Sequence, residues 1–434
     1  MIDILKSRLD VLPSKLTIEG GQKVSGKVRV SGAKNAATRI LAASMLTTET
    51  VTLTNFPTQI VDAMHKMRFI RSLGVDIDIN HEAEAIEINA EEVSKDVVES
   101  YNVPIRTTYL LAAGQIARNG IARIPYPGGC KIGSRGYDLH IMVWEKLGCT
   151  VEEMPDYIEI RGKFAGTAID FPISTIGGTE NALLCTAVAS GQSEIRNAYI
   201  SPEVQNLIEF LRRMGADIEV FGNSLVRVRG MGGLLHGARM AIMPDRIEAL
   251  TWISLAILTG GTLQIDDVPF GDMEIPLIHL QEAGIDLFRN NTSVLVSPSC
   301  LTSGHVQPFE LACGTHPGVI SDMQPFYVML GLAAQGVSRV YDYRYPQRIG
   351  YVSELQKFAP EAFEAESGKI TIRGITQLRA AEANSTDLRG SMAMIMAGIL
   401  AQGTSTIHGV EMALRGYNDL LGKLRQTGIS IHAG

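Results

Sequence analysis

The stretch RRMGADIEV, residues 212–220, contains the pattern on which the fold of this 434-residue chain depends. A helical segment precedes Gly215, and apolar residues alternate with polar ones after it. A glycine directly after a helix is typical of a left-handed cap, and period-2 alternation predicts a strand. The stretch therefore predicts a helix, a tight turn and a strand in immediate succession.

The same pattern recurs along the chain at separations of 74, 67, 69, 75 and 69 residues. Its copies are IRSLGVDID at Gly74, EKLGCTVE at Gly148, the stretch at Gly215, QEAGIDLF at Gly284, the degenerate QKFAPEAF at Ala359 and RQTGISI at Gly428. A second pattern runs in phase with the first, in which an apolar helix ends in Gly and a short strand follows, as in SGQSEIRNA. Together they predict six units of about 70 residues, which could form a solenoid or close into two domains of three.

Length and composition narrow the class of protein. A chain of 434 residues exceeds the size at which one core stops growing, so two domains are expected. The net charge is −7 and no run of Lys or Arg forms a stripe, so no nucleic-acid partner is expected. Five Cys without a framework spacing favour a reducing compartment. The start of the chain lacks a signal-peptide core and no apolar run spans a bilayer, so we expect a cytoplasmic protein without a membrane partner.

Charged residues lie at the predicted starts of the apolar helices. The cations among them are Lys34, Arg106, Arg246 and Arg389, and Thr179, Glu180, Asp245, Asp322 and Asp387 occupy similar places. Acidic and hydroxyl residues there are typical N-caps, and the cap interpretation is favoured for any single helix. A cation there opposes the helix dipole by about 0.3–1 kcal/mol, which predicts an anionic ligand among the four cations.

One cysteine differs in its surroundings from the others. Cys130 lies in the loop YPGGCKIGSRGYDLH, residues 126–140, between glycines and the cations Lys131 and Arg135. Neighbouring cations favour the reactive thiolate, although an incidental loop thiol is the alternative. No His spacing selects a partner base or a zinc pair, and there is no Walker A loop, so we expect no metal and no cofactor.

Six motifs, in this order, resemble those of the enolpyruvyl transferase family, and within it those of the members that act on UDP-N-acetylglucosamine. The motifs are SGAKNAA (31–37), PGGCKIGSR (127–135) followed by YDLH, PDRIE (244–248), HPGVISDMQ (316–324), TDLR (386–389) and RGY (415–417). The resemblance implies an α/β fold, a two-domain inside-out α/β barrel of six βαβαββ repeats, three per domain, with helices inside and sheets outside. It implies an inserted domain over residues 34–244 that carries the Cys130 loop, and a discontinuous domain formed by residues 1–33 and 245–434.

The resemblance also implies the reaction. The enolpyruvyl group of phosphoenolpyruvate passes to the 3-hydroxyl of UDP-N-acetylglucosamine by addition and elimination, with release of phosphate, in peptidoglycan precursor synthesis. Cys130 matches the acid at C3 and the target of the epoxide antibiotic fosfomycin, and Asp322 matches the base on the hydroxyl. The cations around phosphoenolpyruvate match Lys34, Arg135, Arg389 and Arg415. Contacts to the acceptor match Asn35, Arg106, Gly136, Tyr137, Asp138, Leu139, Thr175, Ile176, Gly177, Val340 and Arg344.

Three departures from the family pattern lie near the expected nucleotide region. Gly136-Tyr137 stands where the family usually has Pro after the loop Arg, Ile173 where some members have a phosphate-binding Lys, and Ser201 where the family has Glu. The same reaction on another uridine nucleotide is therefore the alternative. A catalytically inactive relative is a third hypothesis, against which the intact charged residues argue.

Overall fold

The computed structural model describes residues 9, 11–93, 105–126 and 136–434. The chain forms two compact units. Unit 1 takes its described residues from Gly32–Gly129 and Arg135–Met243, and unit 2 from Ser7–Ser31 and Pro244–Gly434.

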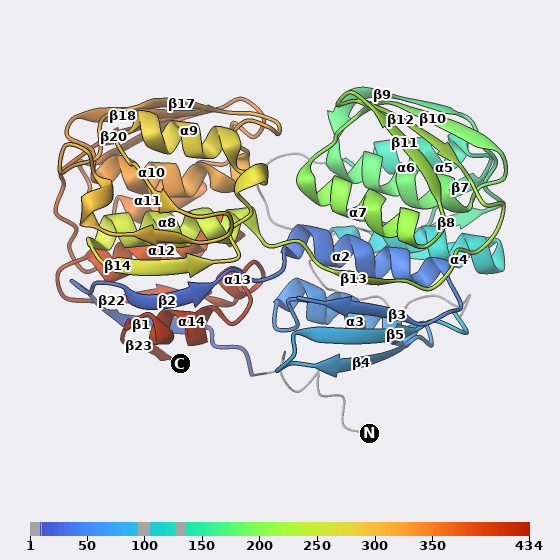
Figure 1. The fold of residues 1–434 in the computed structure, drawn as a ribbon, viewed down its shortest axis with the longest axis horizontal. Helices are drawn as coiled ribbons and strands as arrows, with labels where there is room; N and C mark the ends of the chain where they lie inside the picture. The colour runs from blue at the N-terminus through green and yellow to red at the C-terminus, as the bar shows by residue number, and fades with distance from the viewer. Residues whose placement is uncertain (1–8, 10, 94–104, 127–135) are drawn as a thin grey trace. The chain divides into compact units, whose positions relative to one another are not determined.

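Unit 1 consists of short strands and helices in alternation (Figure 1). Its strands are β3 Val51–Thr54, β4 Asp76–Asn80, β5 Ala85–Asn89, β6 Ile121–Pro125, β7 Thr150–Glu153, β8 Tyr157–Arg161, β9 Ala168–Thr175, β10 Gln192–Ala198, β11 Asp217–Phe221, β12 Leu225–Arg229 and β13 Arg239–Ala241. Its helices are α2 Lys34–Ala43, η1 Ser44–Leu46, α3 Val61–Ser72, η2 Thr107–Leu111, α4 Ala112–Asn119, α5 Asp138–Lys146, α6 Ile176–Val188 and α7 Pro202–Arg213.

Unit 2 repeats the same alternation. Its strands are β1 Lys15–Glu19, β2 Ser25–Arg29, β14 Thr262–Asp266, β15 Phe288–Arg289, β16 Val294–Val296, β17 Glu310–Cys313, β18 Val337–Asp342, β19 Phe363–Glu366, β20 Lys369–Arg373, β21 Glu382–Asn384, β22 Thr404–His408 and β23 Ile431–Ala433. Its helices are α8 Arg246–Thr259, η3 Phe270–Asp272, α9 Glu274–Glu282, η4 Pro298–Cys300, η5 Ser321–Met323, α10 Gln324–Leu332, α11 Gly350–Leu355, α12 Leu388–Leu400, α13 Glu411–Leu414 and α14 Leu420–Gln426.

One strand arrangement recurs in the sheets. In β17-β18-β20-β19 the edge strand β17 runs parallel to β18, and β18, β20 and β19 are then antiparallel neighbours. The sheets β15-β16-β14-β2, β21-β22-β1-β23, β13-β3-β5-β4 and β11-β12-β10-β9 have the same arrangement, and β6-β8-β7 shows its three described strands. This is the βαβαββ repeat expected from the sequence, three copies to each unit. Within the described residues each sheet stays separate and none closes on itself.

The glycines that define the repeat adopt the backbone conformation that was predicted. Gly74, Gly148, Gly215, Gly284 and Gly428 have φ of 94°, 94°, 99°, 77° and 88°. Side chains other than hydrogen are disfavoured at such angles, which explains why glycine occupies the turn between a surface helix and its strand. The degenerate copy at Ala359 is likewise followed by a strand, β19.

The apolar helices form the interior of each unit. In unit 2 the helices α8, α10 and α12 pack against one another, and almost all their residues are buried. A helix that is apolar on all sides needs cover on all sides, and the three sheets of the unit supply it (Figure 1). In unit 1 the helices α2, α4 and α6 occupy the equivalent interior, and α7 packs on α2 and α6. The expected arrangement of helices inside and sheets outside is therefore confirmed.

Two strands each belong to the sheet of one unit and lead along the chain into a helix of the other unit. The strand β2 precedes α2 in sequence but pairs in parallel with β14 of unit 2. The strand β13 precedes α8 but pairs in parallel with β3 of unit 1. The chain after β2 therefore leads directly into the first turn of α2 at Lys34, and the chain after β13 leads into the first turn of α8 at Arg246.

Candidate active site

Asp322 in unit 2 contacts two buried arginines. It lies in the short helix η5, directly before α10. Its Oδ1 is 2.6 Å from Nη1 of Arg348, and its Oδ2 is 3.7 Å from Nε of Arg389. The side chain of Asp322 is 29% exposed, whereas those of the two arginines are 3% and 1% exposed. The carboxylate thus remains accessible while the cations that orient it are enclosed.

Two further carboxylates complete this cluster, and both also cap helices. Asp387 accepts from the first backbone amides of α12 at 3.0 and 3.2 Å and lies 2.9 Å from Nη2 of Arg348. Asp245 accepts from the first amides of α8 at 2.8 and 3.2 Å and lies 3.9 Å from Arg389. The cap interpretation is therefore correct for both, and each cap also faces a buried cation.

The electrostatics of the cluster are those of mutually paired buried ions. Burial lowers the pKa of Arg348, but the carboxylates of Asp387 and Asp322 outweigh this effect and raise it above its ordinary value. Burial likewise opposes the charge of Arg389, and Tyr417, Asp245 and Asp322 raise its pKa. Both guanidinium groups therefore stay charged in the interior of unit 2.

The RGY motif holds Arg389 from its other side. Nη1 of Arg389 donates to the carbonyl of Gly416 at 3.2 Å, and the guanidinium carbon lies 4.9 Å from the centre of the Tyr417 ring. The Tyr417 hydroxyl is 3.0 Å from Oγ1 of Thr251 on α8. Arg415 is also buried, with Nη1 3.6 Å from Sδ of Met412. Two motifs that are 26 residues apart in sequence thus contribute their arginines to one positively charged cluster.

In unit 1 the predicted residue Lys34 begins the buried helix α2. Its Nζ lies 2.9 Å from Oδ2 of Asp62 on α3, and the two side chains are 16% and 8% exposed. Asn35, the next residue of α2, is half-buried. Because a cation at a helix start opposes the helix dipole, Asp62 offsets part of that cost.

A second group of predicted residues in unit 1 surrounds His140. Arg106 donates from Nη2 to the carbonyl of Gly136 at 2.8 Å, and its guanidinium carbon is 5.9 Å from the Tyr109 ring centre. That ring is 3.7 Å from the ring of His140 on α5. A Cβ built on Gly177 of α6 would lie 3.3 Å from the His140 ring. The start of α6 can approach this ring closely because residue 177 is a glycine.

Three further residues that were predicted to contact the acceptor form the start of α6. Thr175 caps the helix through Oγ1, which accepts from the amide of Gly178 at 3.4 Å, and Ile176 and Gly177 form the first turn. Free amides at a helix start favour anions. On the neighbouring segment, the Tyr137 hydroxyl donates to Glu153 at 2.7 Å, which raises the pKa of Tyr137 to about 12. Asp138 and Leu139 begin α5 directly after it.

The chain resembles known proteins over almost its whole length. Residues 18–424 match the family described as EPSP synthase (3-phosphoshikimate 1-carboxyvinyltransferase). A UDP-N-acetylglucosamine 1-carboxyvinyltransferase from Trichlorobacter lovleyi is 33% identical over 96% of this chain and 98% of its own. One from Acidobacterium capsulatum is 35% identical over 96% and 95%. The chain belongs to the enolpyruvyl transferase family.

Solved structures share the fold of this enolpyruvyl transferase. The enolpyruvyl transferase NikO from Streptomyces tendae superposes with a TM-score of 0.87 over 98% of this chain and 99% of its own, at 23% identity. An EPSP synthase from Acinetobacter baumannii superposes with a TM-score of 0.71 over 97% and 99%, at 17% identity. These similarities establish the architecture.

Sequence reasoning missed Arg348 in this enolpyruvyl transferase. Arg344, which was selected as a contact to the acceptor, donates its backbone amide to Asp342 at 3.1 Å, and its role stays a prediction; Arg348, which donates to Asp322 at 2.6 Å, was not selected. Arg348 stands two residues before α11, so a cation at a helix start was the available signal. Val340, also predicted, is fully buried at the middle of β18. His140 and Tyr109 were missed as well, and no spacing in the sequence pointed to them.

The departures from the family pattern have visible local roles. Ser201 caps α7, with Oγ accepting from the amide of Val204 at 3.4 Å. Ile173 on β9 is 59% exposed, so this apolar side chain is not used in packing. Cys130, Lys131 and Arg135 lie outside the described residues.

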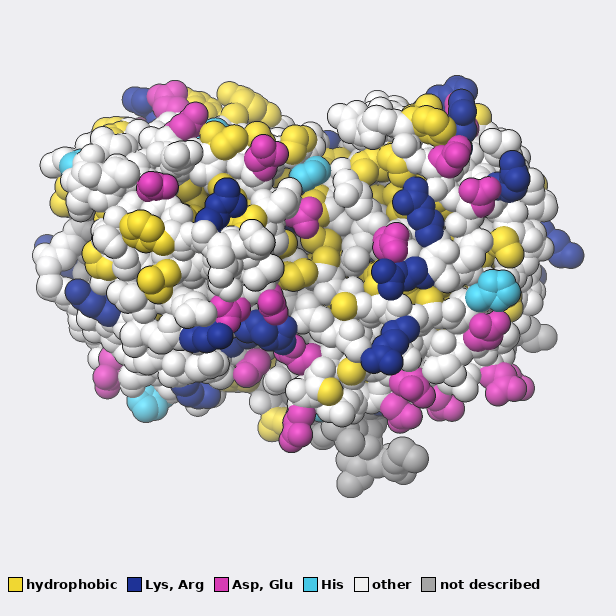
Figure 2. All heavy atoms as spheres, in the orientation of Figure 1, with side chains coloured by type: hydrophobic (Ala, Val, Ile, Leu, Met, Phe, Trp, Pro, Cys, Tyr) yellow, Lys and Arg dark blue, Asp and Glu magenta, His cyan; other side chains and the backbone are white. Residues whose placement is uncertain are grey.

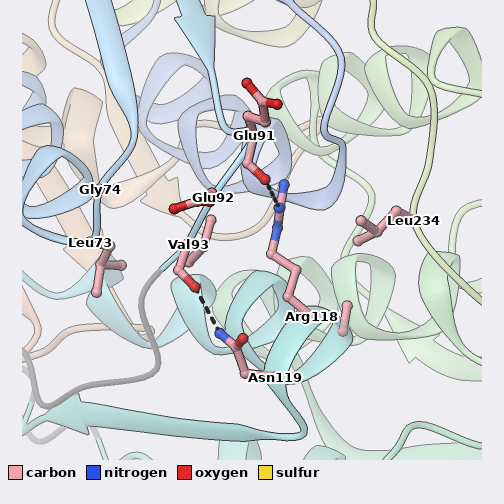
Figure 3. A pocket seen from close by; sticks show the side chains of 9 residues that line it. Leu73, Gly74, Glu91, Glu92, Val93, Arg118, Asn119 and Leu234 are labelled. Atoms are coloured by element: carbon pink, nitrogen blue, oxygen red, sulfur yellow. Dashed lines mark hydrogen bonds between the residues drawn. The ribbon is translucent and has the colours of Figure 1, made fainter.

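A cavity of about 670 Å³ lies in unit 1, away from the predicted residues. Figure 3 shows its wall, where Arg118 donates to the carbonyl of Glu91 at 3.3 Å and Asn119 donates to that of Val93 at 3.0 Å. Arg118 also donates to the carbonyls of Met45 and Thr47, and burial lowers its pKa. The Arg118 side chain therefore donates its hydrogen bonds to backbone carbonyls. None of the predicted site residues lines this cavity.

The surface shows no single charged patch on the face drawn in Figure 2, where Lys and Arg side chains are interspersed with Asp and Glu. Across the part of the chain that the structure describes, none of the helices has the length and apolar character to cross a membrane.

Proposed function

We propose that this enolpyruvyl transferase moves the enolpyruvyl group of phosphoenolpyruvate onto the 3-hydroxyl of UDP-N-acetylglucosamine and releases phosphate. The observation that carries the proposal is the identity of 33–35%, over about 96% of the chain, with relatives that bear the name of this reaction. The reducing compartment favoured by its cysteines makes the cytoplasm the proposed place of action.

Asp322 is the proposed base. It is partly exposed and is fixed by Arg348 at 2.6 Å, so it can receive a proton from a hydroxyl without reorienting. In the addition step the acceptor oxygen bonds to C2 of phosphoenolpyruvate as its proton passes to Asp322. C3 gains a proton, for which Cys130 is the proposed donor. In the elimination step C3 loses a proton, the bond between C2 and the phosphate oxygen breaks, and phosphate leaves.

The cations match the charge of the substrates. Phosphoenolpyruvate carries a carboxylate and a phosphate, both of which arginine binds through paired hydrogen bonds. Arg389 is pre-oriented by Gly416, Tyr417 and two carboxylates, and Lys34 by Asp62. Groups held in place before binding need no reorganisation when charge develops, which supports their assignment to the reacting substrate.

The nucleotide of the acceptor is assigned to the group around His140. Arg106 supplies a cation, the start of α6 supplies free amides, and Tyr109 and His140 supply ring surfaces. The departures at Gly136 and Tyr137 lie beside this group, so a different uridine nucleotide would be distinguished here.

A phosphate-release assay with phosphoenolpyruvate and a panel of uridine nucleotides, in buffer containing EDTA, tests the proposal. We expect turnover with UDP-N-acetylglucosamine and none with UMP. Turnover with UMP alone would select the alternative acceptor. Turnover that requires an added divalent ion would contradict the mechanism, and nucleotide binding without turnover on any acceptor would indicate an inactive relative.

A further inference from the structure

Two charged residues of unit 1 lie one helical turn beyond predicted substrate residues. On α2, Arg39 follows Asn35 by four residues, and on α6, Glu180 follows Ile176 by four. Residues four apart share one face of a helix. A layer of charge therefore lies beneath the residues that are proposed to meet the acceptor.

These two residues form a largely enclosed ion pair. Nε of Arg39 lies 2.8 Å from Oε1 of Glu180, and the side chains are 13% and 1% exposed. Lys66 on α3 is fully buried nearby and donates to the carbonyl and hydroxyl of Thr107 at 3.1 and 3.3 Å. Burial raises the pKa of Glu180, and Arg39 opposes that shift. A buried carboxylate of this kind stays in place because its partner cation is fixed beside it.

The other end of Arg39 reaches the side chain of Asn35. Nη1 of Arg39 is 3.4 Å from Oδ1 of Asn35 and 2.9 Å from Oγ1 of Thr38. A guanidinium has only donors, so the asparagine must turn its oxygen, not its nitrogen, toward Arg39. The amide nitrogen of Asn35, with its two donors, is then the end left for a ligand.

We propose that Arg39, anchored by Glu180, fixes the orientation of the Asn35 amide, so that Asn35 selects an acceptor through an oxygen that accepts a hydrogen bond. Arg39 is a positioning residue in this account and does not touch the substrate. The inference rests on the proposed function, because it takes Asn35 to contact the acceptor.

The paired variant Arg39→Met with Glu180→Gln tests the inference, because changing both partners removes one positive and one negative charge together. We expect the KM for UDP-N-acetylglucosamine to rise about tenfold, since an amide free to flip no longer presents only donors. The KM for phosphoenolpyruvate and kcat should stay within about twofold.

Arg39→Lys is the second variant: it keeps a charge opposite Glu180 but lacks the fork that also reaches Asn35. We expect it to raise the acceptor KM with an unchanged Tm.

A matched control exists in the same unit. Arg123 and Glu159, on β6 and β8, pair at 2.7 Å with side chains 27% and 6% exposed, and neither is a predicted site residue. Arg123→Met with Glu159→Gln should leave both KM values unchanged. A rise in acceptor KM in this control equal to that in the Arg39 variant would attribute the effect to general loosening of unit 1, which overturns the inference.

A double-mutant cycle separates action through Asn35 from a direct contact. In an Asn35→Ala background, the paired Arg39 and Glu180 changes should alter the acceptor KM by less than about twofold. Full additivity would overturn the inference. Wild-type enzyme that turns over UDP-N-acetylglucosamine, together with unchanged acceptor KM in the Arg39 variants, overturns the inference alone. Wild-type enzyme without any turnover overturns the proposed function, and the inference with it.

Discussion

Arg348 donates to Asp322 at 2.6 Å and, through its second terminal nitrogen, to Asp387 at 2.9 Å. One buried guanidinium thus connects the partly exposed carboxylate before α10 to the cap of α12. The connection orients Asp322 without covering it.

Asp322→Asn should lower kcat by about 10²–10⁴, because asparagine keeps the shape of the side chain but cannot receive the proton of the hydroxyl. Binding of both substrates should change little, since the charge-pairing partners Arg348 and Arg389 stay in place. Calorimetry for binding and phosphate release for turnover check this. A variant with half the wild-type turnover would remove Asp322 from the mechanism.

Arg348→Met should reduce kcat at least tenfold and lower stability by about 3–5 kcal/mol, because it leaves two carboxylates of unit 2 without their shared buried cation. Arg348→Lys should recover part of the stability but less of kcat, since it cannot reach both carboxylates through a fork.

The matched control is Arg339→Met, which breaks the exposed pair with Glu310 on the neighbouring strands at 2.6 Å. That pair is worth about 0–1 kcal/mol, so the control should retain full turnover. Equal loss in both variants would contradict a specific role for Arg348.

His140 should make stability depend on pH below neutrality. Burial, with help from Arg106, lowers its pKa from 6.5 to about 3. Between these values the unfolded chain binds the proton and the folded one does not, so stability is present above pH 6.5 and is lost as the pH falls, at about 1.4 kcal/mol per pH unit. Urea unfolding at pH 7, 6, 5 and 4 measures this slope. His140→Phe should flatten it, whereas His432→Gln, an exposed control, should not; identical slopes in all three proteins would show that His140 is not the group responsible.

Fosfomycin should alkylate Cys130 and no other cysteine. Cys149, Cys185, Cys300 and Cys313 are buried free thiols. Burial raises the pKa of Cys149 to about 11 and shifts those of Cys185 and Cys313 upward as well, which disfavours the thiolates that react. Intact-mass spectrometry with peptide mapping checks the site, and Cys130→Asp should escape modification while keeping some turnover. An adduct on a buried cysteine, or none with the acceptor present, would overturn the assignment of Cys130.

The sequence alone was sufficient for the repeat. A glycine that must adopt positive φ after each helix, and apolar residues with a fixed period, are local requirements that one strand or helix reveals by itself. The six copies were predictable for this reason, whereas their βαβαββ content and the interior position of the apolar helices were implied by the resemblance to the enolpyruvyl transferase family. That the inserted segment 34–244 and the remainder fold as independent domains stays a prediction, as do the roles of the site residues.

Tertiary structure alone decided which side chains meet. Nothing local indicates that Arg348 pairs with Asp322, because the two residues are 26 positions apart and meet only in the folded unit. The pairing of β2 with β14 and of β13 with β3 joins segments about 190 to 240 residues apart, which no period records. The Arg39–Glu180 pair likewise bridges 141 residues between two buried helices. Local propensity fixes an element, but the partner of a buried charge is fixed only when packing excludes water from both groups.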